Sequence, residues 1–136
     1  MTKCGRFGAN KFDYSPDAIR DSVQRSLERL QTDYLDTVYL HDTEFVCTPV
    51  MPTTTGNHLA ALNEKRAEYG LADGQEGVVR GQGDQKILDA FSALRELQER
   101  GVIKKIGITG TQSLHNIIMA LRSLTSISQV TPNLSC

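Results

Sequence analysis

His41 is the side chain of this sequence best placed to do chemistry. It closes a run of β-branched, aromatic and aliphatic residues, Val38–His41, which predicts a short strand. Because side chains alternate across a strand, Tyr39 shares a face with His41, and the intervening residues face the other way. A histidine at the C-terminal end of a strand lies where α/β folds place their functional groups. The alternative is that His41 only hydrogen-bonds loop carbonyls, since position in a fold does not establish function.

Two amphipathic helices are predicted on either side of this strand. Ser15-Pro16-Asp17 is a helix start, because serine caps free N–H groups and proline suits the first turn. The apolar side of this helix consists of Ile19, Val23, Leu27 and Leu30. Asp84 is predicted to cap the second helix, and Gly101 to end it. The apolar side of the second helix consists of Ile87, Leu88, Phe91, Leu94 and Leu97.

Further elements complete an alternating order of strands and helices. Met1–Gly5 is interpreted as either a strand remnant or a frayed end of the chain. Ile106–Thr109 is predicted as a short strand, and Ser113 as the cap of a third helix. Residues 6–14 are predicted to be loop. This alternation indicates a parallel sheet with right-handed crossovers, and therefore an α/β fold.

A long polar stretch, residues 42–83, separates the His41 strand from the second helix. Its prolines and glycines argue against regular structure, except for a helix predicted from His58 to Tyr69 and stopped by Gly70. A connection of this length is unusual in a compact domain and is often functional or disordered.

Composition excludes several classes of function. The chain has 136 residues, a net charge of −1 and no clustered basic face, so we expect no nucleic-acid partner. No apolar run is long enough to cross a membrane, and no apolar signal core follows the start of the chain. Its three cysteines lie far apart and are odd in number, which suits a reducing compartment with Cys4 and Cys47 as small apolar packers. We therefore expect a cytoplasmic location.

A series of short motifs runs in order along residues 2–110. They are Thr2-Lys3, Ser26-Leu27-Glu28-Arg29-Leu30, Asp33-Tyr34-Leu35-Asp36, Tyr39-Leu40-His41, Leu94-Arg95-Glu96-Leu97, Gly101 and Ile106-Gly107-Ile108-Thr109. In this order they resemble the middle of an aldo-keto reductase. Residues 42–83 further resemble the branch that contains fungal D-arabinose 1-dehydrogenase and plant L-galactose dehydrogenase.

The resemblance implies a (β/α)₈ TIM barrel that binds NADP or NAD across its C-terminal face. The family chemistry is reversible hydride transfer between the cofactor and a carbonyl or alcohol, here of a sugar or an aldehyde. Residues 1–136 resemble the third to fifth βα units, with the edge of a sixth. They would form a single partial domain in which residues 42–83 are a loop insertion.

The resemblance also assigns candidate site residues. Lys3 falls at the family lysine, whose cation lowers the pKa of a catalytic tyrosine. His41 falls at the family histidine, which hydrogen-bonds the substrate oxygen. Thr109 falls near a residue that contacts the nicotinamide carboxamide. Gly110, the second candidate for cofactor binding, stands where many members have asparagine.

The sequence departs from the family pattern at both ends. The family tyrosine and aspartate precede the lysine, and the adenosine-phosphate site follows the fifth unit, so neither has a counterpart in residues 1–136. We therefore expect a piece of the barrel, inactive alone, that self-associates through exposed sheet edges. One alternative is a non-catalytic cofactor-binding or regulatory module. Another is a metal site using His41, Asp42, Glu44 and His58, disfavoured because these residues lack a repeated ligand spacing, so no metal is expected.

Overall fold

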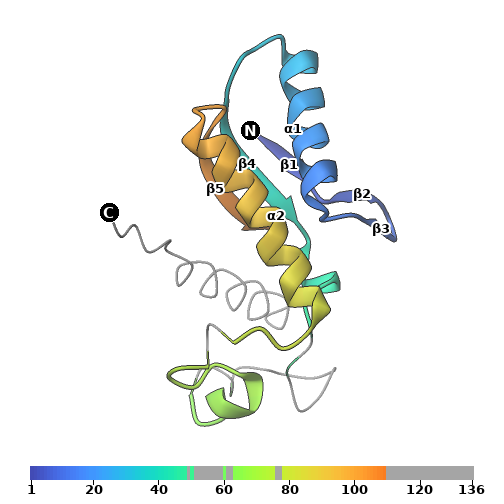
Figure 1. Cartoon of the computed structure of the whole chain (residues 1–136). Helices are drawn as coiled ribbons and strands as arrows, with labels where there is room; N and C mark the ends of the chain where they lie inside the picture. Colours follow the sequence, from blue (N-terminus) through green and yellow to red (C-terminus); the bar gives the residue numbers. More distant parts are fainter. Residues whose placement is uncertain (49, 51–59, 61–62, 76–77, 110–136) are drawn as a thin grey trace.

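The computed structural model describes residues 1–48, 50, 60, 63–75 and 78–109 of the chain. Its centre is a three-stranded sheet in the order β1 (Thr2–Cys4), β4 (Leu35–His41) and β5 (Ile103–Thr109). Both pairings are parallel. Two helices, α1 (Pro16–Leu30) and α2 (Gln82–Glu99), lie side by side over one face of this sheet (Figure 1). The predicted α/β class with a parallel sheet is confirmed.

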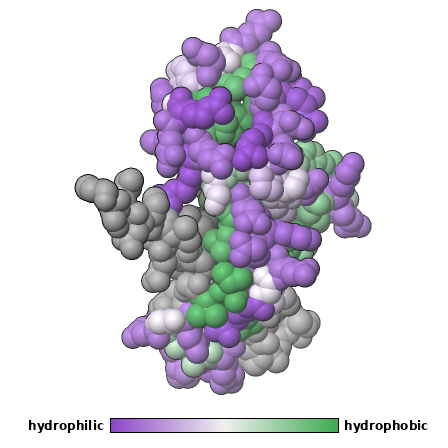
Figure 2. Space-filling view, viewed as in Figure 1, coloured by the Kyte–Doolittle hydropathy of each residue, from purple (hydrophilic) through white to green (hydrophobic). Residues whose placement is uncertain are grey.

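The central strand β4 begins three residues earlier than predicted, at Leu35. The predicted division of its faces is confirmed, because Val38 and Leu40 are fully buried whereas Tyr39 and His41 are half-buried. Apolar residues from both helices join this layer, among them Ile19, Val23, Ile87, Phe91 and Leu94. The outward surfaces of the helices are mostly hydrophilic (Figure 2), as expected of amphipathic helices on a sheet.

Helix α1 begins as the sequence predicts. The Ser15 hydroxyl accepts a hydrogen bond from the backbone N–H of Ala18 at 3.4 Å, and Pro16 occupies the first turn. The prediction that Leu30 belongs to the buried side is wrong, because its side chain is 58% exposed. Leu30 lies in the last turn, next to Gln31, whose left-handed backbone (φ 51°) turns the chain toward β4.

Helix α2 begins at Gln82, so the prediction that Asp84 caps it is wrong. Asp84 lies inside the first turn, and its carboxylate accepts hydrogen bonds from the backbone N–H groups of Thr48 and Arg80, both at 2.9 Å. Gly83 is required here, since a Cβ atom would meet the Val46 carbonyl oxygen at 1.9 Å. The predicted stop at Gly101 is confirmed by its left-handed backbone (φ 77°) just after the helix.

The prediction of loop over residues 6–14 is wrong in part. Strands β2 (Arg6–Gly8) and β3 (Lys11–Phe12) pair antiparallel as a short hairpin. In the described part of the predicted 58–69 helix, Ala60 is in a 3₁₀ conformation and Arg66–Tyr69 form the 3₁₀ turn η3, followed by left-handed Gly70. A second 3₁₀ turn, η1 (Thr43–Phe45), follows β4.

Some predictions lie outside the described residues. These are His58, Gly110 and the third helix beginning at Ser113. Within the described part of the chain, no helix is both long and apolar enough to cross a membrane.

Replacing Leu40 tests whether the covered face of the sheet is the core. We expect Leu40→Ala to lower the free energy of unfolding by about 2–5 kcal/mol, because it leaves a cavity between β4 and the helices. Leu30→Ala is the matched control and should change it by less than about 0.5 kcal/mol. Urea unfolding followed by circular dichroism measures both, and equal effects would contradict this core.

Candidate functional site

The register of the three parallel strands gathers the predicted site residues on one face. Lys3 pairs with Tyr39 across β1 and β4, and His41 pairs with Thr109 across β4 and β5. Residues paired in register point to the same side of a sheet, as do residues two apart along a strand. Lys3, His41 and Thr109 therefore share the face opposite the two helices. Gly110, the fourth predicted site residue, lies outside the described residues.

Tyr39 lies across this face rather than away from it. It pairs with Gly107 of β5, and a Cβ atom built on Gly107 would lie 2.8 Å from the Tyr39 ring. The ring therefore covers the backbone of β5, and glycine is the residue that leaves room for it. Tyr39 thus shields the middle of the face between Lys3 and the strand ends.

Asp42, the residue after β4, turns back toward His41. Its backbone is left-handed (φ 60°), a conformation that aspartate tolerates better than most residues. The carboxylate is fully buried, and its Oδ2 atom lies 3.4 Å from His41 Nε2 and also pairs with Arg6 Nη1. The Asp42 backbone N–H donates to the Thr109 carbonyl at 2.8 Å, which joins the ends of β4 and β5.

The Arg6 guanidinium contacts both the hairpin backbone and two aromatic rings. Its Nε and Nη2 groups donate to the carbonyls of Gly8 at 3.0 Å and Ala9 at 3.1 Å. Its guanidinium carbon lies 5.5 Å from the ring centre of Phe12 and 5.8 Å from that of Phe45. Sequence reasoning missed Arg6 altogether and considered Asp42 only as a metal ligand. An aspartate directly after a strand-end histidine was the available signal.

Tyr14 contacts the same end of β4. Its hydroxyl donates to the His41 backbone carbonyl. Burial, and after it the negative charges of Asp42 and Glu44, raise the pKa of the Tyr14 phenol well above its ordinary value. This phenol therefore stays protonated and acts as a structural donor.

The two buried cysteines behave as predicted, as apolar packers. Cys4 and Cys47 are both buried. The Cys4 thiol lies 3.6 Å from the Tyr39 carbonyl, and burial raises its pKa to about 12. A protonated, covered thiol is a poor nucleophile and a poor metal ligand. Among the described residues, which do not include His58, no group of three potential metal ligands comes together.

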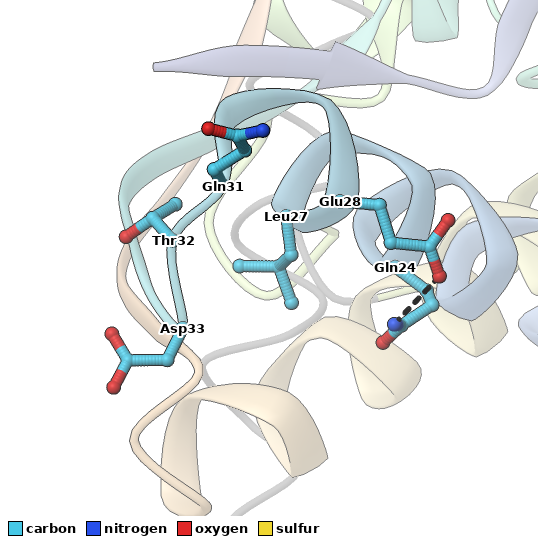
Figure 3. A pocket seen from close by; sticks show the side chains of 6 residues that line it. All are labelled: Gln24, Leu27, Glu28, Gln31, Thr32 and Asp33. Carbon is cyan, nitrogen blue, oxygen red and sulfur yellow. Dashed lines mark hydrogen bonds between the residues drawn. The ribbon is translucent and has the colours of Figure 1, made fainter.

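The described surface has hollows beside β1 and at one end of α1. A cleft of about 270 Å³ lies beside Lys3, between β1, the hairpin and α1, and its lining includes Arg6, Arg25 and Arg29. A larger, more open hollow of about 700 Å³ lies at the C-terminal end of α1 (Figure 3). The latter is at the opposite end of β4 from His41 and contains no candidate residue.

The Thr109 hydroxyl is a buried polar group at the end of β5. Its Oγ1 atom is buried and has no hydrogen-bond partner within the described residues. A buried hydroxyl without a partner is destabilising, and an amide group of a ligand satisfies it. The carboxamide contact predicted for Thr109 stays a prediction.

Comparison with known proteins gives a consistent family. A sequence model of the aldo/keto reductase family matches residues 1–136. D-arabinose 1-dehydrogenase of Saccharomyces cerevisiae is 40% identical over 109 residues, which are 80% of this chain and 22% of that protein. L-galactose dehydrogenase of Arabidopsis thaliana is 32% identical over 109 residues, 80% of this chain and 23% of that protein. The chain thus spans less than a quarter of the length of these relatives.

Solved structures give matches to the same family. An aldo-keto reductase from Bacillus halodurans, in its holo form, is 25% identical with a TM-score of 0.45, and the match covers 82% of this chain and 26% of that one. A putative aldo-keto reductase from Pseudomonas aeruginosa is 27% identical with a TM-score of 0.46, and covers 88% of this chain and 34% of that one.

The raised pKa of Cys4 makes stability depend on pH in the alkaline range. Above the usual thiol pKa of 9.0 the unfolded chain loses this proton, whereas the folded chain keeps it up to about pH 12. The unfolded state then binds fewer protons, so the free energy of unfolding falls as pH rises, by at most about 1.4 kcal/mol per pH unit for this group. We expect urea unfolding at pH values between these limits to show a shallower fall in Cys4→Ala and Cys4→Ser. A slope identical to that of the unchanged chain would contradict a buried thiol.

Proposed function

Because this chain belongs to the aldo/keto reductase family, we propose that it supplies part of the site at which such an enzyme transfers a hydride between a nicotinamide cofactor and a carbonyl or alcohol. In this proposal residues 1–136 form one partial barrel domain, the third to fifth βα units, with residues 42–83 as an insertion. Parallel strands with both helices on one face support it. The observation that carries the proposal is the shared face of Lys3, His41 and Thr109.

The substrate we propose is a small sugar with a carbonyl or hydroxyl at its reacting carbon. The support is the 40% identity to a protein named D-arabinose 1-dehydrogenase and the 32% identity to one named L-galactose dehydrogenase. Both names describe oxidation of a sugar, and both matches include most of this chain.

Each residue of the face has a separate role in this proposal. The Lys3 ammonium favours the ionised form of a proton-donating group beside it. His41 hydrogen-bonds the reacting oxygen of the substrate and stabilises charge that develops there. Strand spacing and rise place the Cα atoms of Lys3 and His41 roughly 8 Å apart, which leaves room for a small ligand between the side chains.

Thr109 would hold the nicotinamide end of NADP or NAD through its hydroxyl, which has no hydrogen-bond partner among the described residues. When bound, the cofactor supplies or accepts the hydride. No described residue is assigned to the adenosine phosphates of the cofactor. The choice between NADP and NAD depends on the residues that contact those phosphates.

We also propose that residues 1–136 do not turn over substrate alone, because no tyrosine of this chain is placed as a proton donor. Tyr14 is committed to the His41 carbonyl, and the Tyr39 ring covers Gly107. The Lys104 Nζ atom lies 4.0 Å from the centre of the Tyr34 ring. Tyr69, in the 3₁₀ turn η3, is buried. Loss of a general acid typically reduces the rate by ~10²–10⁴.

A chimeric enzyme tests the proposal. The matching segment of the yeast D-arabinose 1-dehydrogenase is replaced by the segment of this chain that contains residues 3–109. We expect oxidation of D-arabinose with NADP or NAD, and we expect Lys3→Met to lower kcat/KM by about 10²-fold or more. Lys86→Met, at an exposed position on α2, is the matched control and should leave kcat/KM unchanged.

Two outcomes contradict the proposal. A folded chimera that does not oxidise the sugar, or one that tolerates Lys3→Met as well as Lys86→Met, removes the catalytic role and leaves a non-catalytic module. Oxidation of D-arabinose by residues 1–136 alone, abolished by Lys3→Met, refutes the inactivity of the isolated chain.

A further inference from the structure

The strongest unassigned feature of the described chain is the cleft of about 270 Å³ beside β1. Its lining includes two β1 residues whose side chains point to opposite faces of the sheet. The Thr2 hydroxyl lies 3.3 Å from the Ser26 hydroxyl of α1, whereas Lys3 lies on the face opposite the helices. A cleft that touches both residues must run along the outer edge of β1, between α1 and the hairpin of β2 and β3 (Figure 1).

The outer edge of β1 is open in the described sheet. The strand order is β1, β4 and β5, so β4 occupies only one side of β1. The backbone N–H and C=O groups on the other side of an edge strand can pair with an added strand. A polypeptide supplies donors and acceptors at the matching spacing, whereas a small anion or a phosphate backbone offers acceptors alone.

The charge of the cleft has one sign. Four of the lining side chains are cations, Lys3, Arg6, Arg25 and Arg29, three carry hydroxyls and none is a carboxylate. The sequence alone predicts no clustered basic face, because these cations come from three different elements. Asp42 compensates Arg6, but no carboxylate among the described residues lies within ion-pair distance of the other three. The cleft therefore keeps positive charge available to a partner.

The spacing of Arg25 and Arg29 on α1 supports this interpretation. Residues four apart lie on the same side of a helix, where two like charges repel each other. Arg29 suits the last turn of α1, but Arg25 lies one turn earlier, where the helix dipole favours it less. Asp21, one turn before Arg25, does not line the cleft. Arg25 instead lies over the ring of Phe7, 5.8 Å from its centre, and Phe7 is 41% exposed.

An acidic, extended polypeptide segment would match both the backbone edge and the charge. We propose that the edge of β1 and the cleft beside it bind such a segment as an added strand, with its carboxylates facing Arg25 and Arg29 and an apolar side chain covering Phe7. The segment lies outside this chain's own tail, because residues 110–136 contain neither aspartate nor glutamate. This interaction surface does not depend on the proposed function.

Peptide binding to the full 136-residue chain tests this inference. The probe is a peptide of about ten residues that alternates glutamate and valine, so that its carboxylates share one side of a strand. We expect it to shift the backbone amide signals of Thr2, Lys3 and Cys4 in ¹H–¹⁵N correlation spectra. The same peptide with N-methylated backbone amides keeps its charge but loses its hydrogen-bond donors, and we expect it to bind at least about tenfold more weakly.

Arg25→Gln combined with Arg29→Gln is the informative double variant. Both side chains are exposed, so we expect the fold to be retained. An exposed ion pair contributes up to about fivefold in affinity, so we expect the double variant to bind the acidic peptide roughly tenfold more weakly at low salt. Lys86→Gln combined with Arg100→Gln removes the same charge from exposed positions on and just after α2. This matched control should keep the affinity of the unchanged chain.

Three outcomes of the peptide experiment would overturn the inference. They are β1 amide signals that do not respond, a double variant that binds as tightly as its control, and an N-methylated peptide that binds as tightly as the unmodified one. Tighter binding of inorganic phosphate or of single-stranded DNA at the same ionic strength would make the ligand an anion rather than a polypeptide. Sedimentation of the chain alone tests the remaining occupant. Self-association that Arg25→Gln with Arg29→Gln abolishes would assign the edge to a second copy and contradict an acidic partner.

Discussion

The parallel pairing of β4 with β1 on one edge and with β5 on the other is the constraint on which the candidate site depends. Side chains alternate with a period of two, so a slip of one residue in either pairing would move Lys3 or Thr109 to the face beneath the helices. The packing of the opposite face prevents this slip. Val38 and Leu40 are fully buried against α1 and α2, and exposing one such side chain costs about 1.5–3 kcal/mol. An apolar core on one side of the sheet therefore determines which polar side chains meet on the other.

A second constraint is electrostatic and joins the hairpin to the end of the sheet. The buried Asp42 carboxylate needs a cation, and Arg6 reaches it from β2 while its Nε and Nη2 groups donate to carbonyls of the hairpin turn. Removing Arg6 leaves the fully buried Asp42 charge without this cation, and breaking a buried pair in this way typically costs ~3–5 kcal/mol. The rings of Phe12 and Phe45 flank the guanidinium and limit its contact with water. The hairpin is thus part of the support of His41.

Local signals in the sequence predicted those parts of the fold that local chemistry determines. Ser15-Pro16-Asp17 marked the start of α1, the alternation of Val38–His41 marked its strand, and Gly101 marked the end of α2. The errors come from contacts distant in sequence. The hairpin has only five residues in strands, and what holds it is Arg6 reaching Asp42, 36 residues away. Aspartate is a residue type that often caps helices, but the Asp84 carboxylate accepts a hydrogen bond from the backbone N–H of Thr48, on the far side of the loop.

The candidate residues could be found by resemblance, but their arrangement could not. No periodicity in the sequence states that Lys3 pairs with Tyr39 or that His41 pairs with Thr109, so the shared face is a result of the structure. The roles of Lys3, His41 and Thr109 remain predictions, and the position of Gly110 is outside the described residues.

Cross-strand nuclear Overhauser effects between backbone protons test the register most directly. The account predicts effects that link Lys3 with Tyr39, Tyr39 with Gly107 and His41 with Thr109, in the pattern of a parallel sheet. Effects that instead pair Lys3 with Val38 or Leu40, or Gly107 with His41, would contradict it. Either alternative would separate the residues that the proposed function requires on one face.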